Sequence, residues 1–208
     1  MNNISADIYE NIDGAVLAGG ENSRFSGKVK ANMVVGDKPI IQKTLEIMDS
    51  VFSATLIITN YSQEFPAYNS YKMFEDIYKK VGPLGGIHSA LTHSSAEAVF
   101  VVAGDMPGLS GKLIRQLSDY FLVSGCEVLI PSTDGNIEPL HAIYSREILD
   151  RLDAYLSAGN NYAIRNFLND VKVEYLEISA SEDHRSSFFN INTPADLEKA
   201  RRNKARKQ

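Results

Sequence analysis

The sequence LAGGENSRFSGKVK fills residues 17–30 and directly follows a short apolar run at residues 14–17. Two adjacent glycines, Gly19 and Gly20, let the backbone approach a ligand closely and expose N–H groups as an anion-binding nest. Ligands of open α/β sheets bind beyond the carboxyl ends of the strands, and this loop follows such an apolar run. The segment therefore predicts a first strand that leads into a phosphate-binding loop.

Outward from this loop, apolar runs rich in β-branched residues alternate with helical patterns. Further runs short enough to be buried strands lie at residues 54–59, 98–103 and 127–130. Apolar residues repeat at helical spacing in residues 41–52, 113–121 and 148–156. This alternation predicts a three-layer α/β fold with a mainly parallel mixed sheet and helices on both faces.

The last third of the chain continues the pattern. Later strands are expected at residues 138–144 and 171–178, and helices near residues 145–156 and 162–168. Thr193-Pro194 combines an N-cap hydroxyl with a proline at the first helical position, so it opens the last helix.

The composition fits one domain over residues 1–208, with flexible ends at residues 1–12 and 203–208. Because 44% of the 208 residues are hydrophobic, the chain can bury a substantial core. The apolar runs are far shorter than the roughly 18 residues of a membrane span, and the polar start carries no secretory signal. We therefore expect a cytoplasmic protein with no membrane partner. The single cysteine, Cys126, is expected to be a small buried residue on a strand.

The charge balance limits the ligands. A formal net charge of −5 argues against a nucleic-acid partner, so an anionic substrate needs a local basic pocket. One basic cluster lies in the loop at residues 17–30 and contains Arg24, Lys28 and Lys30. A second lies at residues 199–207, after the last expected helix, and contains no aromatic residue. We interpret the second cluster as a solvated tail, with weak anion binding as the alternative.

The basic residues of the loop suit a triphosphate, because Arg24 and Lys30 place mobile positive charge beside the glycine pair. A P-loop is excluded, since Val29 follows Gly27-Lys28 and Asn22 stands where the first glycine of that motif belongs. The dinucleotide pattern G-x-G-x-x-G is absent as well. On composition alone, a flexible glycine loop with solvated charges is the alternative.

An aspartate ends another of the expected strands. Residues 101–107 read VVAGDMP, so the apolar run stops before Asp105, and Pro107 prevents its continuation. This order places Asp105 at the carboxyl edge of the sheet, where a carboxylate can hold a divalent metal against phosphate oxygens. An ordinary turn before the proline is the alternative.

Two polar residues and a turn-rich loop are candidates for base recognition. Asn60 follows the run at residues 54–59, and Asp76 precedes the sequence VGPLGGI at residues 81–87. Asn60 and Asp76 can hydrogen-bond a base or ribose, and the glycines permit close packing against a flat ring. Ordinary turn roles are the alternative for both side chains.

The histidines carry no catalytic signal, because none has a Ser or Cys nucleophile motif nearby. His88 and His93 lie in an expected helix, His141 on an expected strand and His184 in an expected polar loop. We interpret all four as structural or surface residues.

Together these segments resemble the molybdenum cofactor guanylyltransferase family. The resemblance runs from about residue 13 to about residue 200 and rests on the order and spacing of these motifs: Leu17-Ala18-Gly19-Gly20, Arg24, Lys30, Asp76, Gly82-Pro83-Leu84-Gly85-Gly86, Asp105-Met106-Pro107 and Asn190-Ile191-Asn192-Thr193-Pro194. It implies a Rossmann-like nucleotidyltransferase fold and an enzyme that joins the GMP part of GTP to the terminal phosphate of molybdopterin, releasing pyrophosphate.

The resemblance also implies roles for individual residues. The nucleotide-binding positions are Leu17, Ala18, Gly19, Gly20, Lys30, Asn60, Asp76 and Asp105. Catalysis is assigned to Arg24, Lys30 and Asp105, with Asp105 as the ligand of Mg²⁺. The implied partners are GTP, molybdopterin or the molybdenum cofactor, and then the cofactor-delivery proteins and molybdoenzymes that receive the product.

The chain departs from the family pattern at three positions. Val29 stands where an acid often precedes the lysine, Phe25 replaces a common methionine, and Gly104 replaces a frequent cysteine. A related branch of the family that transfers CMP has the sequence Leu-Ala-Ala-Gly in the first loop and lacks a clear Gly-Pro-Leu-x-Gly segment. Gly19 and the loop at Gly82 therefore favour guanine.

This chemistry needs no histidine, because the attacking group is an already ionised phosphate. Catalysis then reduces to alignment and charge neutralisation. Two alternatives remain: a nucleotidyltransferase for another phosphate acceptor, using CTP or a sugar phosphate, and a GTP-binding or cofactor-handing module without turnover.

The segment before the last helix is assigned to the acceptor side. Asn190 and Asn192 flank Ile191, and alternate residues of an extended stretch face the same side. Both amides can therefore point into a cleft while Ile191 anchors the segment, and the resemblance places the segment near the acceptor and the metal. Turn and cap amides are the alternative.

Overall fold

The structure, a computed structural model, describes residues 8–19, 24–25, 28–159, 161–179 and 181–205, with the backbone alone at 24–25, 28, 182–183 and 204–205. The strands are β1 (Ile12–Leu17), β2 (Arg24–Phe25), β3 (Lys28–Val29), β4 (Val34–Val35), β5 (Lys38–Pro39), β6 (Thr55–Ile58), β7 (Lys72–Phe74), β8 (Ala98–Ala103), β9 (Val128–Thr133), β10 (Asn136–Ile137), β11 (His141–Ser145) and β12 (Val173–Glu177). The α-helices are α1 (Ile40–Asp49), α2 (Pro83–His93), α3 (Gly111–Ser124), α4 (Leu149–Ser157), α5 (Ile164–Phe167), α6 (Glu182–Ser187) and α7 (Pro194–Ala205).

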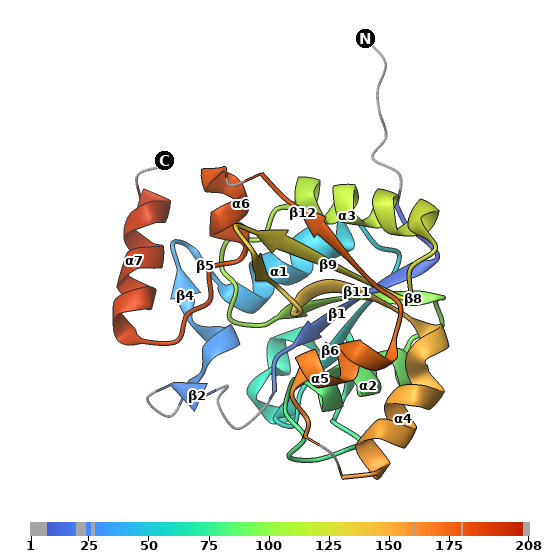
Figure 1. Cartoon of the computed structure of the whole chain (residues 1–208). Helices are drawn as coiled ribbons and strands as arrows, with labels where there is room; N and C mark the ends of the chain where they lie inside the picture. The colour runs from blue at the N-terminus through green and yellow to red at the C-terminus, as the bar shows by residue number, and fades with distance from the viewer. Residues whose placement is uncertain (1–7, 20–23, 26–27, 160, 180, 206–208) are drawn as a thin grey trace.

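A twisted mixed sheet forms the centre of the molecule (Figure 1). Its strand order is β10-β9-β11-β8-β1-β6-β7, and β12 pairs with β9. The pairs β1–β6, β1–β8, β6–β7 and β9–β12 are parallel, whereas β11 runs antiparallel to both β8 and β9. The predicted mainly parallel mixed sheet is therefore confirmed.

Each face of the sheet carries its own apolar core, as the alternation of side chains along strand β8 shows. Phe100 and Val102 pack into one core with helices α1 and α3, while Val99 and Val101 pack into the other with α2 and α4. All four of these side chains are fully buried. A run of apolar residues without polar alternation is what a strand covered on both faces requires.

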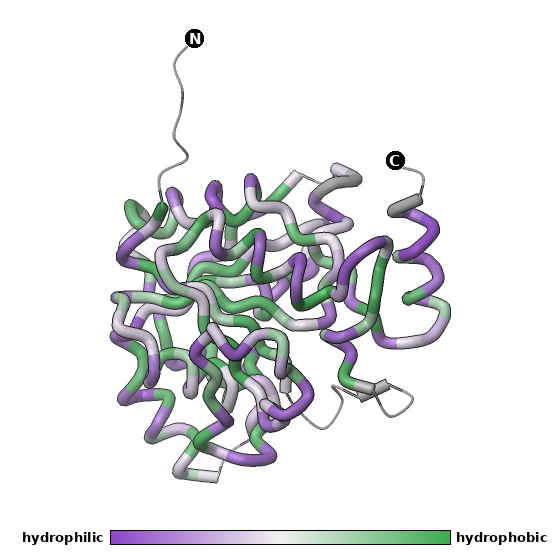
Figure 2. Tube along the Cα trace, turned by 180° about the vertical axis from the view of Figure 1, so that it is seen from behind, coloured by the Kyte–Doolittle hydropathy of each residue, from purple (hydrophilic) through white to green (hydrophobic). Residues whose placement is uncertain are grey.

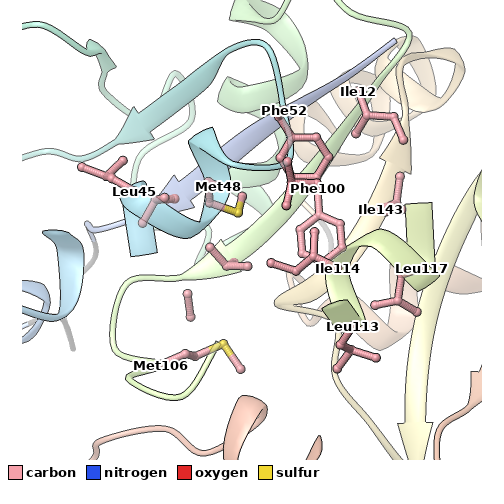
Figure 3. Close-up of a cluster of buried hydrophobic side chains, with 14 of the residues drawn as sticks. Ile12, Leu45, Met48, Phe52, Phe100, Met106, Leu113, Ile114, Leu117 and Ile143 are labelled. Atoms are coloured by element: carbon pink, nitrogen blue, oxygen red, sulfur yellow. The ribbon is translucent and has the colours of Figure 1, made fainter. Parts of the chain in front are cut away.

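The figures show the same division into layers. In Figure 3, side chains of α1 and α3 converge on Phe100 and Ile143 of the sheet, with Phe52 closing the cluster. Figure 2 shows apolar residues along the central strands and polar residues along the outer turns of the helices. Among the described residues, none of the helices combines the length and apolar character needed to span a membrane.

A third, smaller cluster holds the C-terminal helix. The hairpin of β4 and β5 contributes Val35 to this cluster, and Ile40 opens helix α1 beside it. Ile191 and Ala200 supply the C-terminal side, with Ile191 fully buried. The segment before α7 is therefore fixed against the main body by packing.

Three expectations about individual elements need correction. The strand expected at residues 138–144 begins only at His141, because residues 138–140 form a turn that precedes β11. In that turn the N–H of His141 donates to the carbonyl of Glu138 at 3.0 Å. His184 lies in helix α6, not in a polar loop, because Ser181 caps that helix by accepting from the His184 N–H. Cys126 is buried as expected but lies before β9, not within a strand.

The described parts of both ends are more ordered than the flexible ends expected at residues 1–12 and 203–208. Tyr9 forms a bridge with Phe52, and Ile12 begins β1 with its side chain fully buried. At the other end, α7 extends to Ala205.

Candidate active site

A cavity of about 590 Å³ opens at the carboxyl ends of four neighbouring parallel strands, β1, β6, β7 and β8. Each strand contributes residues at its last position or directly after its end. Parallel strands end at the same edge of a sheet, so residues distant in sequence meet there. The predicted nucleotide-binding residues that line this cavity are Leu17, Ala18, Gly19, Lys30, Asn60, Asp76 and Asp105.

The loop after β1 is fixed by backbone hydrogen bonds to both neighbouring strands. The carbonyl of Leu17 accepts from the Gly104 N–H at 2.9 Å, and the N–H of Ala18 donates to Ile58 at 2.9 Å. At Gly19, a Cβ atom would lie 2.9 Å from the backbone N of Asn60, so any larger residue would force the two loops apart. This close approach explains the first glycine of the pair.

Two predicted residues of this loop cannot be placed in the site. Gly20 lies outside the described residues. The backbone of Arg24 pairs with Val29 in the β2–β3 hairpin, but the position of its side chain is not described.

Lys30 joins the nucleotide loop to two other parts of the chain. Its Nζ donates to Asp105 Oδ2 at 3.2 Å and to Asn192 Oδ1 at 3.0 Å. The side chain of Lys30 is 9% exposed, and a buried ammonium group is stable only with such partners. Three segments thus place a cation, a carboxylate and an amide at one point. We call Lys30, Asp105 and Asn192 the junction triad.

The segment before α7 is attached directly to the end of strand β8. The N–H of Ile191 donates to the carbonyl of Asp105 at 3.0 Å, and the Ile191 side chain is fully buried. Asn190 and Asn192 both line a second cavity, while Asn192 lines the first as well. The structure therefore brings both predicted amides to the rim of the cleft, with Ile191 as the predicted anchor.

Asn60 and Asp76 form a hydrogen-bonded pair at the other end of the first cavity. Asn60 Nδ2 donates to Asp76 Oδ2 at 2.7 Å, and the Asp76 N–H donates to Asn60 Oδ1 at 3.2 Å. Burial raises the pKa of the Asp76 carboxyl group above its ordinary value, although the hydrogen bond from Asn60 opposes this shift. The pair presents oriented polar groups at a partly desolvated position, which suits recognition of a base.

Sequence reasoning missed two lysines at this end. Lys79 Nζ donates to Asn60 Oδ1 at 2.7 Å and to Glu75 Oε2 at 2.7 Å. Lys80 also lines the cavity and has a φ of 62°, which is uncommon for a residue other than glycine. The signal in the sequence was a pair of basic residues directly before the turn-rich loop at residue 82.

The second cavity, of about 350 Å³, adjoins the first. The two share Asp105 and Asn192, together with Ala103 and Leu140. Glu138 also lines the second cavity, and sequence reasoning did not single it out. Burial raises the pKa of the Glu138 carboxyl group above its ordinary value.

In the described part of the chain, no histidine lines either cavity. His141 is wholly buried between Phe100 and Phe188, and burial lowers its pKa to about 3, so it is neutral at physiological pH. His88 is buried between α2 and α4, where it contacts Asp153 at 3.2 Å. Among the described residues, no three His, Cys, Asp or Glu side chains gather as a metal-binding group.

Comparisons with known proteins agree on a family. The MobA-like NTP transferase domain matches residues 14–174. A relative from Thermococcus gammatolerans, named probable molybdenum cofactor guanylyltransferase, is 38% identical over 194 residues, covering 89% of this chain and 97% of the relative. A relative of the same name from Natranaerobius thermophilus is 32% identical over 203 residues, covering 94% and 97%.

A solved structure shows the same fold. The crystal structure of molybdopterin-guanine dinucleotide biosynthesis protein A from Archaeoglobus fulgidus matches with a TM-score of 0.77 and 29% identity, covering 93% of this chain and 99% of that protein. The motifs that resemble the guanylyltransferases thus lie on the expected fold. The chain belongs to the MobA-like family of nucleotidyltransferases, together with the molybdenum cofactor guanylyltransferases that it resembles in sequence.

Proposed function

We propose that this chain transfers the GMP part of GTP to the terminal phosphate of molybdopterin and releases pyrophosphate. The observation that carries the proposal is the junction triad, because it stands where the two cavities adjoin. One cavity carries polar groups suited to a nucleotide, and the other is open to a second substrate. A transfer between two bound substrates requires this arrangement.

The nucleotide lies in the first cavity, with its base near the Asn60–Asp76 pair. Guanine carries a ring N–H and an exocyclic amine on one edge, and both need acceptors. The Asp76 carboxylate supplies acceptor oxygens, and Asn60 orients it through a hydrogen bond of 2.7 Å. Gly82 lines the cavity, and the space where a side chain would begin at this residue is open, which permits close approach of the ligand to the backbone.

The reaction breaks the bond between the α- and β-phosphates of GTP and forms a bond from an acceptor phosphate oxygen to the α-phosphorus. The acceptor oxygen is already ionised at neutral pH, so no general base is required. Lys30 and Arg24 then serve the leaving group, because negative charge builds on pyrophosphate as the bond breaks. The buried ammonium of Lys30 is held in place by the other two members of the junction triad.

The residues present fit a divalent cation, and we propose Mg²⁺. Asp105 and Asn192 offer a carboxylate and an amide oxygen, both within 3.2 Å of one ammonium group. Mg²⁺ is usually bound through one or two carboxylates together with water and substrate phosphates, so the site does not need a larger acidic cluster. When bound, the ion supplies positive charge that neutralises the phosphate oxygens during transfer.

We expect the reaction to take place in the cytoplasm, where GTP is available. The product dinucleotide then passes to cofactor-delivery proteins and molybdoenzymes.

The test is pyrophosphate release with each nucleoside triphosphate, with and without molybdopterin, in the presence of Mg²⁺. We expect release that depends on both GTP and molybdopterin. Equal release with CTP would contradict the guanine assignment, and release with a sugar phosphate in place of molybdopterin would contradict the acceptor. Binding of GTP with no release under any condition would identify a binding module without turnover.

A further inference from the structure

Glu138 is held in place by the turn between β10 and β11. The N–H of Glu138 donates to Pro131 at 3.0 Å, and its carbonyl accepts from the His141 N–H at 3.0 Å. Pro139 occupies the second position of this turn, where its fixed φ is favourable. The hydroxyl of Tyr144 also donates to the carbonyl of Pro139 at 2.7 Å. The turn precedes β11 and places residues 138–140 in the wall of the second cavity.

The Glu138 carboxylate is half-buried, yet within the described part of the chain it has no hydrogen bond and no ion pair. Glu177 of strand β12, by contrast, has hydrogen-bond partners, because its carboxylate accepts from Ser132 and from the N–H of Asp134. A partly desolvated carboxylate without a partner is costly, and such groups in a cavity are commonly completed by a ligand.

The rest of the second cavity suits a flat ring that ends in a phosphate. Met106, Leu140 and Ile164 provide apolar walls, and Met106 is 1% exposed. Asp105 and Asn192 of the junction triad line the same cavity and the first one as well, so the phosphate of an acceptor has to arrive beside them.

We propose that the second cavity is the subsite for the pterin ring of the acceptor and that Glu138 determines specificity by accepting hydrogen bonds from the 2-amino group and N3–H of that ring. This inference rests on the proposed function, which supplies a pterin phosphate as acceptor. A carboxylate accepts two parallel hydrogen bonds from two adjacent N–H donors. The 2-amino group and N3–H of the pterin ring form such a pair of donors at neutral pH. The apolar walls then stack on the ring faces.

The experiment uses two fluorescent probes that differ at one position of the ring. They are 6-hydroxymethylpterin phosphate and the corresponding lumazine phosphate, which has a carbonyl in place of the 2-amino group. Dissociation constants are measured for the wild type, Glu138→Gln and Glu147→Gln. Glu147 is a matched control, because it is exposed at the far end of β11 and lines neither cavity.

We expect the wild type and Glu147→Gln to bind the pterin probe roughly 10- to 100-fold more tightly than the lumazine probe, as charge-assisted hydrogen bonds require. In Glu138→Gln this preference should vanish or reverse, because the amide can donate to the lumazine carbonyl. Unchanged melting temperatures and an unchanged GTP dissociation constant would locate the effect at the ring.

Two outcomes would overturn the inference. The first is a wild type that binds both probes equally, or a Glu138→Gln protein that retains the wild-type preference. The second is an unchanged probe preference together with an altered Mg²⁺ dependence of turnover, which would make Glu138 a metal ligand. GMP transfer to molybdopterin by the wild type is measured in parallel. Its absence would defeat the proposed function, whereas transfer without probe discrimination would defeat this inference alone.

Discussion

The two cavities are built in different ways. The first lies on the ends of four neighbouring parallel strands, and backbone hydrogen bonds between strand-end residues, such as Ala18 to Ile58, set its geometry. The second is assembled from the end of β8, the turn at Glu138 and the segment at residues 190–192. The backbone hydrogen bond from the Ile191 N–H to the carbonyl of Asp105 ties that segment to the residues that follow β8. The geometry of the nucleotide side is therefore set by the sheet, whereas the geometry of the acceptor side depends on a few hydrogen bonds and packing contacts.

The largest effect is expected where the two sides meet. Replacing Asp105 with Ala should reduce GMP transfer about 1000-fold or more, because the metal loses its carboxylate and Lys30 loses its ionic partner. Steady-state turnover over a Mg²⁺ titration measures this effect. The melting temperature should also fall, because the buried Lys30 ammonium keeps only Asn192 as a partner, so turnover is compared at a temperature where both proteins are folded.

Asp150→Ala is the matched control for Asp105→Ala, because Asp150 is exposed in the first turn of α4 and lines neither cavity. Its turnover should equal that of the wild type. Near-normal turnover of Asp105→Ala at every Mg²⁺ concentration would remove Asp105 from the metal site.

Lys30→Ala should lower kcat/KM about 10- to 100-fold, since a charged hydrogen bond to phosphate is lost where charge builds on the leaving group. Lys43→Ala is the control, because Lys43 is also largely buried and pairs with Asp37 at 3.2 Å, outside both cavities. Steady-state kinetics of both variants measure kcat/KM and show whether the loss is specific to Lys30. A larger defect at Lys43 or at Lys28 would show that the loop has been assigned wrongly.

The nucleotide side is tested through Asp76. Asp76→Asn should weaken GTP binding roughly tenfold and leave CTP binding nearly unchanged, because it replaces an acceptor that only guanine requires. Calorimetric titration with both nucleotides provides the measurement. Equal or tighter binding of CTP by the wild type would contradict the guanine assignment outright.

The raised pKa of Asp76 predicts that the affinity for GTP depends on pH. Burial raises the pKa of Asp76 above 3.8, so the carboxylate is protonated at a higher pH than an ordinary aspartate. GTP affinity should accordingly fall as the pH is lowered toward that raised pKa, since the neutral form no longer accepts two hydrogen bonds. In Asp76→Asn this part of the decline should be absent. An identical decline in both proteins would assign it to another group.

The smallest effect is expected on the acceptor side. Asn192→Ala removes the amide that contacts Lys30 at 3.0 Å and that we propose beside the metal, so it should raise the KM for molybdopterin and the Mg²⁺ concentration for half-maximal turnover about fivefold, while GTP affinity stays nearly constant. Kinetics at limiting molybdopterin, together with a melting curve, distinguish an amide that acts on the acceptor from an amide that only stabilises the turn. A lowered melting temperature with both substrates impaired together would indicate a turn residue instead.

The sequence predicted the nucleotide side well for a physical reason. Gly19, Asn60 and Asp105 each stand within two residues of the end of a continuous apolar run, and in parallel strands those runs must end at one edge of the sheet. The pattern of the runs therefore determines where the polar residues meet. Lys30 was expected at the same edge because it ends the glycine-rich loop that follows β1, although part of that segment forms the hairpin of β2 and β3.

The acceptor side was predicted less completely, because its geometry depends on tertiary packing. Glu138 stands within a run that reads as one strand, and Pro139 was not enough to indicate the turn that directs Glu138 to the cavity. Lys79 was missed since its importance comes from a contact with Asn60 across two loops. Asn192 was found only through its alternation with the anchor Ile191 and through the family resemblance.

The most direct test of the central claim follows the label of GTP carrying radioactive phosphorus at the α position, compared with the γ position. We expect the α-label to move to molybdopterin as a guanine dinucleotide only when Mg²⁺ and the acceptor are present, while the γ-label appears in pyrophosphate. Release of γ-label as inorganic phosphate, with the α-label left in GDP, would show that the chain hydrolyses GTP and would contradict the transfer of GMP.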